Sequence, residues 1–238
     1  MQHSNIRAVF LDAGDTLFRE RAGRPSMYAE VATAHGGIAD AAAARSALES
    51  AVRDLPSSVE GNFRYSLAWF RAFNERVMET CGVDAARHEA AHEELVRRFT
   101  DPRSYQVFEE VPEVLEELVG RGFQIGVVSN WSEALPALLE GLGIGASISF
   151  VVTSADLRAE KPDRAIFERA LFRAGTAADE AVHVGDHFEK DVRGALNAGM
   201  RAVLVDRDAE TADDREGVPV IGDLRDLLQL LEAHTVRT

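Results

Sequence analysis

Five short apolar runs recur along the chain, with helix-forming stretches between them. The runs occupy residues 8–11, 125–128, 148–152, 181–184 and 202–205. Most of them are too apolar for half-exposed strands, and strands that are buried on both faces and separated by helices are typical of a parallel sheet. The intervening helices are predicted at 111–120, 133–141, 164–174 and 192–198, followed by a closing amphipathic helix at 223–233. The pattern predicts an α/β core with a Rossmann-like, doubly wound parallel sheet.

The alternation of strands and helices is interrupted between the first apolar run and residue 111. Roughly ninety residues there carry helical patterns with no convincing strand among them. The helices are predicted at 26–35, 40–54, 65–80 and 85–99. Apolar residues at near-helical spacing favour a separate small core, and these residues are Trp69, Phe70, Phe73 and Val77. The sequence therefore predicts an inserted α-helical cap at 19–103 and a core formed by 1–18 and 104–238.

Composition and charge limit the class of protein and the kind of partner. The 238 residues are 46% hydrophobic, which is enough for one α/β domain with a smaller unit attached. A formal net charge of −14 argues against a nucleic-acid partner, because nucleic acids are bound mainly through basic patches. The single cysteine, Cys81, excludes an internal disulfide and fits a reducing compartment, and no apolar stretch approaches membrane-spanning length. We expect a cytoplasmic protein that binds a small molecule and no membrane.

Polar residues follow several of the predicted strands. They are Asp12 after the first run, Ser129 and Asn130 after the second, Lys161 after the third, and Asp186 with Asp191 after the fourth. Open parallel sheets bind ligands at the carboxyl ends of their strands, so these side chains are expected to converge on one crevice. Lys161 stands out further because the chain has only one other lysine, Lys190.

These groups form a set suited to phosphoryl transfer. A carboxylate can attack phosphorus and form an acyl phosphate only if the repulsion between the two anions is neutralised. Asp12, Asp186 and Asp191 offer the hard oxygen ligands that Mg²⁺ prefers, and Lys161 adds a second positive charge. The Ser129 hydroxyl can donate a hydrogen bond to a transferring phosphoryl oxygen. The alternative is that Asp12 and Asp186 only cap helices and that Ser129 begins a turn.

The four groups, in this order and separation, resemble the four signature motifs of the haloacid dehalogenase superfamily. Residues 185–195, Gly-Asp-His-Phe-Glu-Lys-Asp-Val-Arg-Gly-Ala, are similar to the fourth motif, and the helical insertion resembles the cap of the first subfamily. The resemblance implies a hydrolase that uses Mg²⁺ and acts on a small anionic, phosphorylated metabolite.

The resemblance also implies a role for each matched residue. Asp12 would be the nucleophile and a metal ligand, with the backbone carbonyl of Gly14 as another ligand. Asp186 would bind the metal directly, whereas Asp191 would bind it directly or through water, or would hold Lys161 in place. The transferred group would be bound by Ser129, Asn130 and Lys161.

One position departs from the family pattern. Phosphatases of the family usually carry a second Asp two positions after the nucleophile, where this chain has Gly14. Alternation along an extended segment is expected to point the next residue, Asp15, away from the site. General acid–base catalysis contributes ~10²–10⁴ in rate, so the absence of this Asp weakens the assignment as a phosphatase. Three interpretations stay open: a phosphatase of esters with good leaving groups or with a borrowed acid such as His187, a 2-haloacid dehalogenase, and a catalytically impaired relative that binds a phosphorylated ligand.

Other polar residues could be mistaken for parts of a catalytic or binding site. The segment His-Glu-Ala-Ala-His at 88–92 matches the H-E-x-x-H zinc protease pattern, but it lies in the predicted cap and has no identifiable third ligand. We interpret it as a chance match. His183 is expected to be a strand residue. No role is assigned to Arg24, Arg64 and Arg71, because scattered arginines are usually solvated.

Overall fold

A seven-stranded sheet forms the centre of the computed structural model, which describes residues 6–208 and 214–235. Its strands run in the order β10-β11-β9-β8-β1-β6-β7, and all neighbouring pairs are parallel except β10 with β11. The strands are β1 (Ala8–Leu11), β6 (Gln124–Ser129), β7 (Phe150–Thr153), β8 (Ala181–Gly185), β9 (Arg201–Val205), β10 (Asp214–Arg215) and β11 (Val218–Ile221). The predicted parallel core is confirmed. The pattern missed β11, because Pro219 within a short run argues against a strand.

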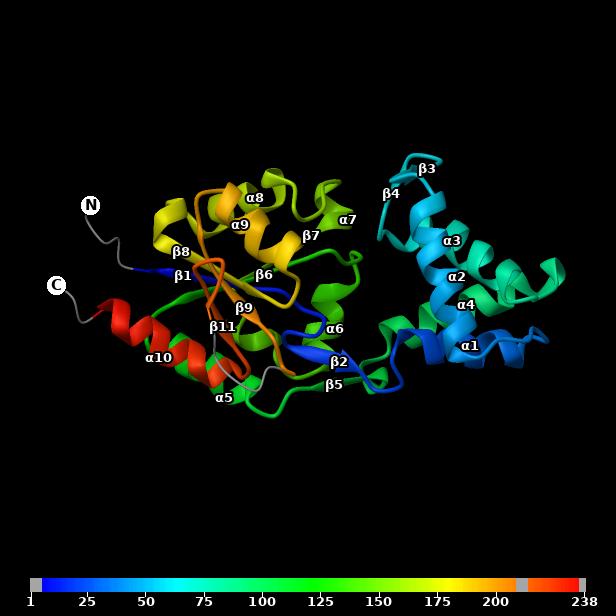
Figure 1. Ribbon diagram of the computed structural model, residues 1–238, viewed down its shortest axis with the longest axis horizontal. Helices are drawn as coiled ribbons and strands as arrows, with labels where there is room; N and C mark the ends of the chain where they lie inside the picture. Colours follow the sequence, from blue (N-terminus) through cyan, green and yellow to red (C-terminus); the bar gives the residue numbers. More distant parts are fainter. Residues whose placement is uncertain (1–5, 209–213, 236–238) are drawn as a thin grey trace.

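Helices cover both faces of this sheet (Figure 1). On one face lie α5 (Val111–Gly120), α6 (Leu135–Gly141) and α10 (Leu224–Thr235), and on the other lie α8 (Arg164–Ala174) and α9 (Gly194–Asn197). The strand period of two explains the division, because Val9 and Leu11 pack in one cluster and Ala8 and Phe10 in the other. A short helix, α7 (Ser154–Leu157), follows β7, and 3₁₀ turns occupy Gly145–Ser147 and Ala178–Glu180. The first of these turns delays β7 relative to its predicted start.

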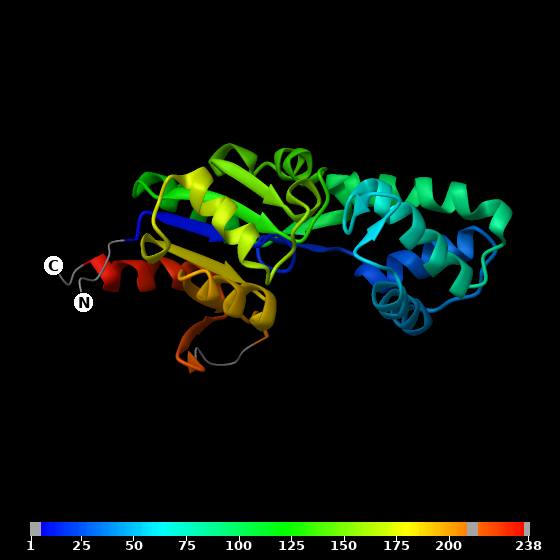
Figure 2. The ribbon, with the colours of Figure 1, turned by 90° about the horizontal axis from the view of Figure 1, so that it is seen from above.

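The helical insertion leaves and rejoins the core through two antiparallel strands, β2 (Phe18–Glu20) and β5 (Tyr105–Val107) (Figure 2). It contains α1 (Arg24–Ala34), α2 (Ala41–Asp54), α3 (Leu67–Thr80) and α4 (His88–Thr100), with 3₁₀ turns at Ala85–Arg87 and Pro102–Ser104. Its own hydrophobic core includes the predicted Trp69, Phe73 and Val77. The exact division into a core of 1–18 and 104–238 and a cap of 19–103 stays a prediction.

One expectation for the insertion was wrong. A small hairpin joins α2 to α3, formed by β3 (Ser58–Val59) and β4 (Asn62–Phe63). Two-residue strands are too short for a period of two to show in the sequence. Within the described ranges, no helix is both long and apolar enough to cross a membrane.

Candidate active site

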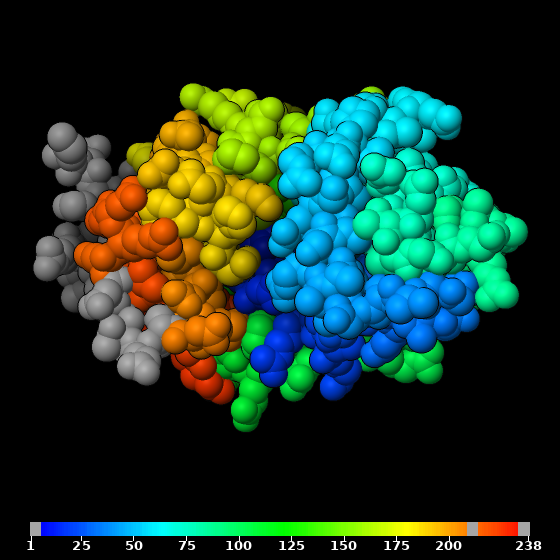
Figure 3. Space-filling view, turned by 45° about the vertical axis from the view of Figure 1, so that its right-hand side comes forward, coloured from blue at the N-terminus to red at the C-terminus, as the bar shows by residue number. Residues whose placement is uncertain are grey.

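The central strand β1 places Asp12 at the carboxyl edge of the sheet. The Asp12 amide continues the ladder by donating to the Val184 carbonyl at 2.9 Å, and the residue is only 8% exposed. Ser129 ends the neighbouring strand β6, and Asp186 follows β8 on the other side. The three groups meet in a cleft of about 510 Å³ between the sheet edge and the helical insertion. Figure 3 shows the hollow between these two parts of the molecule.

A buried lysine lies beside the predicted nucleophile. The Lys161 ammonium is 2.5 Å from Asp12 Oδ1 and 2.5 Å from Asp191 Oδ1, and the residue is 4% exposed. Burial alone would lower the pKa of Lys161, but the charges of Asp12 and Asp191 outweigh it and raise the pKa above its usual value. The lysine therefore carries a fixed positive charge in contact with Asp12.

The main chain of Lys161 is held by the side chain of Asn130. Asn130 Oδ1 accepts a hydrogen bond from the Lys161 amide at 2.7 Å, and Asn130 Nδ2 donates to the Lys161 carbonyl at 3.1 Å. The amide group thus fixes the loop that carries the lysine. Both Ser129 and Asn130 line the cleft, and their predicted contacts with a transferred group stay predictions.

Asp191 lies on a π-helical turn (Phe188–Arg193), a local geometry often found at functional sites. Besides Lys161, its Oδ1 accepts a hydrogen bond from His183 Nε2 at 2.9 Å, and its Oδ2 accepts one from the His187 amide at 3.0 Å. Burial would raise the pKa of Asp191, but Lys161 and His183 lower it below its usual range. Gly185 permits this approach, because a Cβ there would lie 2.4 Å from Asp191 Cγ.

His183 contacts the acid cluster through a hydrogen bond that the sequence did not reveal. It lies on β8 as predicted and is fully buried. Its Nε2 lies 2.9 Å from Asp191 Oδ1, and its Nδ1 has no hydrogen-bond partner among the described residues. A histidine within an apolar run was the only signal, and it did not indicate which residue the imidazole contacts.

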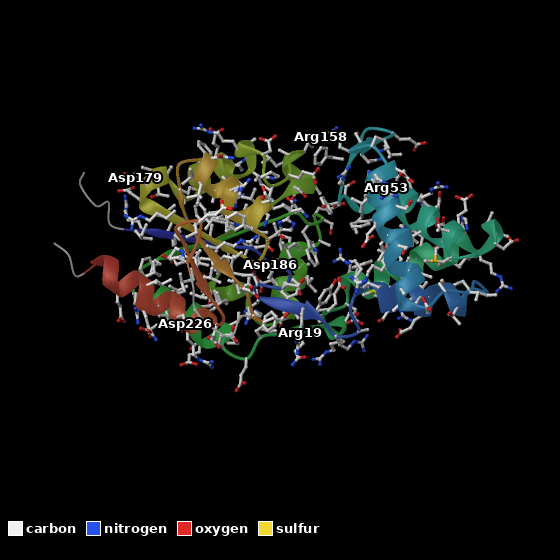
Figure 4. All side chains as sticks on the ribbon, in the orientation of Figure 1. Arg19, Arg53, Arg158, Asp179, Asp186 and Asp226 are labelled. Carbon is white, nitrogen blue, oxygen red and sulfur yellow. The ribbon has the colours of Figure 1, made fainter. Side chains whose placement is uncertain are left out.

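Three carboxylates gather at the floor of the cleft and suit a divalent cation. Oxygen atoms of Asp12, Asp186 and Asp191 all lie within 4.8 Å of one another. Partial burial in the cleft, together with the charges of Asp12 and Asp191, raises the pKa of Asp186 to about 7. Figure 4 shows Asp186 on the side of the core that faces the insertion. Hard oxygen donors at this spacing fit Mg²⁺, and Gly14 lies on the same cleft wall.

An aromatic ring lies over the position of the missing acid. A Cβ built on Gly14 would have one neighbour within 4 Å, the Trp131 Cζ3 atom at 3.2 Å. Gly14 does not have a positive φ, so its backbone conformation suits other residues. The indole of Trp131 packs edge-on against Phe18, with ring centroids 5.6 Å apart. A side chain at position 14 would therefore contact the edge of the Trp131 ring.

The expectation for Asp15 was wrong. Asp15 adopts a φ of 56° and lines the cleft, so the chain is no longer extended there and alternation does not apply. Burial, and then the charge of Glu20, raises the pKa of Asp15. The turn is held by Arg207, which donates to the carbonyls of Thr16 at 2.6 Å and Asp15 at 3.2 Å.

The H-E-x-x-H segment binds its neighbours within the insertion. His88 Nε2 contacts the Val83 carbonyl at 3.0 Å, and His92 Nδ1 contacts Asn74 Nδ2 at 3.0 Å. Glu89 forms an ion pair with Arg71. Within residues 6–208 and 214–235, the one cluster of three metal-ligating side chains is that of the aspartates. The segment is therefore accounted for by packing and pairing inside the helices.

The fold is a parallel α/β core that carries an acid cluster and a buried lysine at the carboxyl edge of its sheet. The family model of haloacid dehalogenase-like hydrolases matches residues 6–199. The chain therefore belongs to the haloacid dehalogenase-like hydrolase family, and it is a hydrolase.

Named relatives of this chain include different activities. The haloacid dehalogenase-like hydrolase domain-containing protein 3 of Danio rerio is 33% identical over 85% of this chain and 86% of its own. A phosphoserine phosphatase of Thermus thermophilus is 36% identical over 67% of this chain and 66% of its own. The crystal structure of a 2-haloacid dehalogenase from Pseudomonas syringae superposes with a TM-score of 0.70 and 29% identity, covering 96% and 99% of the two chains.

Proposed function

We propose that the protein is a magnesium-dependent phosphatase of small phosphate esters that uses Asp12 as a covalent nucleophile. The observation that carries the proposal is the cluster of Asp12, Asp186 and Asp191, whose oxygens lie within 4.8 Å of one another around a single buried lysine. Three carboxylates beside one lysine keep an excess of negative charge, which a bound cation or a retained proton would offset. The proposed setting is the cytoplasm, with a small phosphorylated metabolite as substrate.

Each residue has a role in the proposed reaction. Lys161 occupies Asp12 Oδ1, so Oδ2 is the oxygen that attacks phosphorus. The bond from Asp12 to phosphorus forms as the bond from phosphorus to the ester oxygen breaks, and that oxygen leaves as its anion. Water then attacks the aspartyl-phosphate, which releases phosphate and restores the Asp12 carboxylate. Lys161 and the Ser129 hydroxyl stabilise the negative oxygens of the transferred group.

The metal would be held by Asp12, the Gly14 carbonyl and Asp186, and Asp191 would bind it directly, bind it through water or hold Lys161 in place. When bound, the ion supplies positive charge that offsets the repulsion between the carboxylate and the phosphoryl group. Two of the three donors to Asp191 come from Lys161 and His183, which leaves this carboxylate fewer lone pairs for a metal than Asp186 has. We therefore propose Asp186 as the direct ligand and the Asp191–Lys161 pair as its support.

A second candidate function is dehalogenation of 2-haloacids. It is favoured by Gly14, because a halide leaves without needing a proton, and by the similarity to the Pseudomonas syringae 2-haloacid dehalogenase. The acid cluster disfavours it, since displacement at carbon by a carboxylate needs no cluster of three aspartates. The third interpretation, a relative that binds a phosphorylated ligand without turnover, has Gly14 alone in its favour.

One panel assay tests these alternatives. Phosphate release from a series of small esters and chloride release from 2-chloroacids are measured with Mg²⁺ and then with a chelator. Phosphate release that requires Mg²⁺ and vanishes in a folded Asp12→Asn protein is the expected result. Chloride release that persists in chelator would replace the proposal with the dehalogenase, and binding of phosphate esters without either product would favour the impaired relative.

A further inference from the structure

The cleft extends beyond the acid cluster toward the helical insertion. Four residues line both the main cleft and a small recess beside it, and these are Arg24, Tyr65, Asn130 and Trp131. The recess has a volume of about 30 Å³, and its remaining walls are mostly apolar, from Leu67, Phe70, Val96 and Phe99. A leaving group attached to a phosphate at Asp12 would have to lie along this part of the cleft.

Arg24 presents unused hydrogen-bond donors in this region. Its Nε and Nη2 atoms both donate to Glu20 Oε1, at 2.9 and 2.6 Å. Across 6–208 and 214–235, Nη1 has no hydrogen-bond partner, and 42% of the side chain is exposed. The guanidinium also lies over the rings of Phe99 and Trp131, 5.3 and 5.9 Å from their centroids. Its orientation is therefore fixed before any ligand arrives, which reduces the entropy lost on binding.

Tyr65 lies beside Arg24 in an unusual backbone conformation. Its φ of 70° is rare for a bulky residue, and such strain is concentrated at functional sites. The ring packs on Trp69 and Phe70, at centroid distances of 6.3 and 6.5 Å. Burial, and then the charge of Glu160, raises the pKa of the Tyr65 hydroxyl, and the charges of Arg64, Arg24 and Lys161 oppose this rise. Within the described chain this hydroxyl forms no hydrogen bond.

We propose that Arg24 and Tyr65 form a subsite for the leaving group, and that this subsite selects phosphate esters whose alcohol carries a carboxylate. The proposal rests on the phosphatase function proposed above. A guanidinium edge with two free N–H groups matches a carboxylate in geometry, and the Tyr65 hydroxyl can donate to the same group.

The charge of the cleft favours a carboxylate over a second phosphate. Five acidic side chains line it, namely Asp12, Asp15, Glu20, Asp186 and Asp191, against four basic ones, Arg19, Arg24, Lys161 and Lys190. A bound Mg²⁺ and one phosphate dianion cancel each other. A second dianion would then meet a lining that is slightly negative, whereas a carboxylate adds only one charge and is stabilised by Arg24.

The competing interpretation is that Arg24 only braces the strand β2 through Glu20. The test is the ratio of kcat/KM for a carboxylate ester to kcat/KM for the matching amide ester, which bracing of β2 cannot change. Hydrolysis is measured on two matched pairs, 4-carboxyphenyl against 4-carbamoylphenyl phosphate and carboxymethyl against carbamoylmethyl phosphate. Within each pair the members are similar in size and leaving-group quality, so the missing acid at Gly14 affects both alike. Loss of bracing would lower kcat/KM for both members equally.

The unmodified protein should prefer the carboxylate member of at least one pair by on the order of 10- to 100-fold in kcat/KM, the range for a charge-assisted hydrogen bond. Arg24→Gln should abolish the preference, and Arg24→Lys should retain part of it, since it keeps the charge without the planar fork. Tyr65→Phe should reduce it less. The matched control is Arg19→Gln, which removes another cation that lines the cleft, from the strand β2, and should leave the ratio unchanged.

Calorimetric binding of the same pairs to the Asp12→Asn protein, with Mg²⁺ present, separates this proposal from the phosphatase proposal. If no ester is hydrolysed, the phosphatase function fails, and the binding ratio still reports on Arg24. Equal turnover or equal binding of both members in both pairs would overturn the subsite. The subsite would also be overturned if Arg24→Gln lowered kcat/KM equally for both members of a pair. Loss of the carboxylate preference in Arg19→Gln would overturn it as well.

Discussion

Substitution of Gly14 by aspartate tests the role of the acid that phosphatases of the family usually carry at this position. A Cβ on Gly14 would have a single close neighbour, Trp131 Cζ3 at 3.2 Å, and the residue does not have a positive φ. The obstacle is therefore one edge of the indole and not the backbone. Gly14→Asp alone must push that ring, which is packed against Phe18 and Tyr105, and overpacking of this kind costs about 1–3 kcal/mol.

Combining Gly14→Asp with Trp131→Phe removes the outer ring of the indole and makes room for the carboxylate. General acid catalysis contributes ~10²–10⁴ in rate, and we expect the lower end, about 10²-fold, for a group that has not been optimised. The gain should appear in kcat for an alkyl ester such as ethyl phosphate, whose alkoxide is a poor leaving group. The aryl ester 4-nitrophenyl phosphate should gain much less, because its phenolate leaves without a proton.

The assay compares both esters in the double variant, in Trp131→Phe alone and in Trp131→Phe with Gly14→Asn. The asparagine has the size of aspartate but cannot act as an acid, so it separates proton donation from reshaping of the cleft. Thermal unfolding and Mg²⁺ affinity are measured for each variant first. If the folded double variant binds Mg²⁺ normally and gains nothing on ethyl phosphate over its asparagine control, another residue already serves as the acid or phosphate esters are not the substrates.

Three further predictions follow from the contacts around the site. The pKa of Asp186 is raised from 3.8 to about 7, so the metal-free protein should lose stability as the pH rises through that interval, and Mg²⁺ should bind more tightly over the same range, by up to about tenfold per pH unit. Urea unfolding measures the first trend and calorimetry the second, and Asp186→Asn should remove both. A trend that persists in this variant would exclude Asp186 as its source. His183→Phe keeps the packing on Phe167 but removes the donor to Asp191, so it should lower the free energy of unfolding by about 1.5–3 kcal/mol and reduce kcat, whereas unchanged values of both would refute the contact. Arg207→Gln leaves buried Glu110 without its partner at 2.7 Å and frees the turn after Asp12. The free energy of unfolding, measured in urea, should therefore fall by at least about 1.5–3 kcal/mol. An unchanged free energy of unfolding would show that other groups hold the turn.

Most of the fold and the centre of the site could be predicted from the sequence. The strand Ala8–Leu11 and the helices Val111–Gly120 and Arg164–Ala174 lie where the pattern placed them. Asp12, Lys161 and Asp186 converge as expected, because a parallel sheet brings the ends of its strands to one edge whatever the spacing along the chain. Periodicity and burial are local properties of a sequence, so they identify the elements and, through topology, the residues at their ends.

Only the tertiary structure revealed the contacts between residues that are distant in the sequence. The Trp131 ring over Gly14, the Arg207 contacts with the turn after Asp12 and the left-handed backbone of Asp15 have no periodic signature. The same holds for His183, whose place in an apolar strand predicted burial but not its hydrogen bond to Asp191. The orientation of such side chains depends on how helices and strands pack in three dimensions, and that packing is set by the whole molecule and not by the residues next to them in the chain.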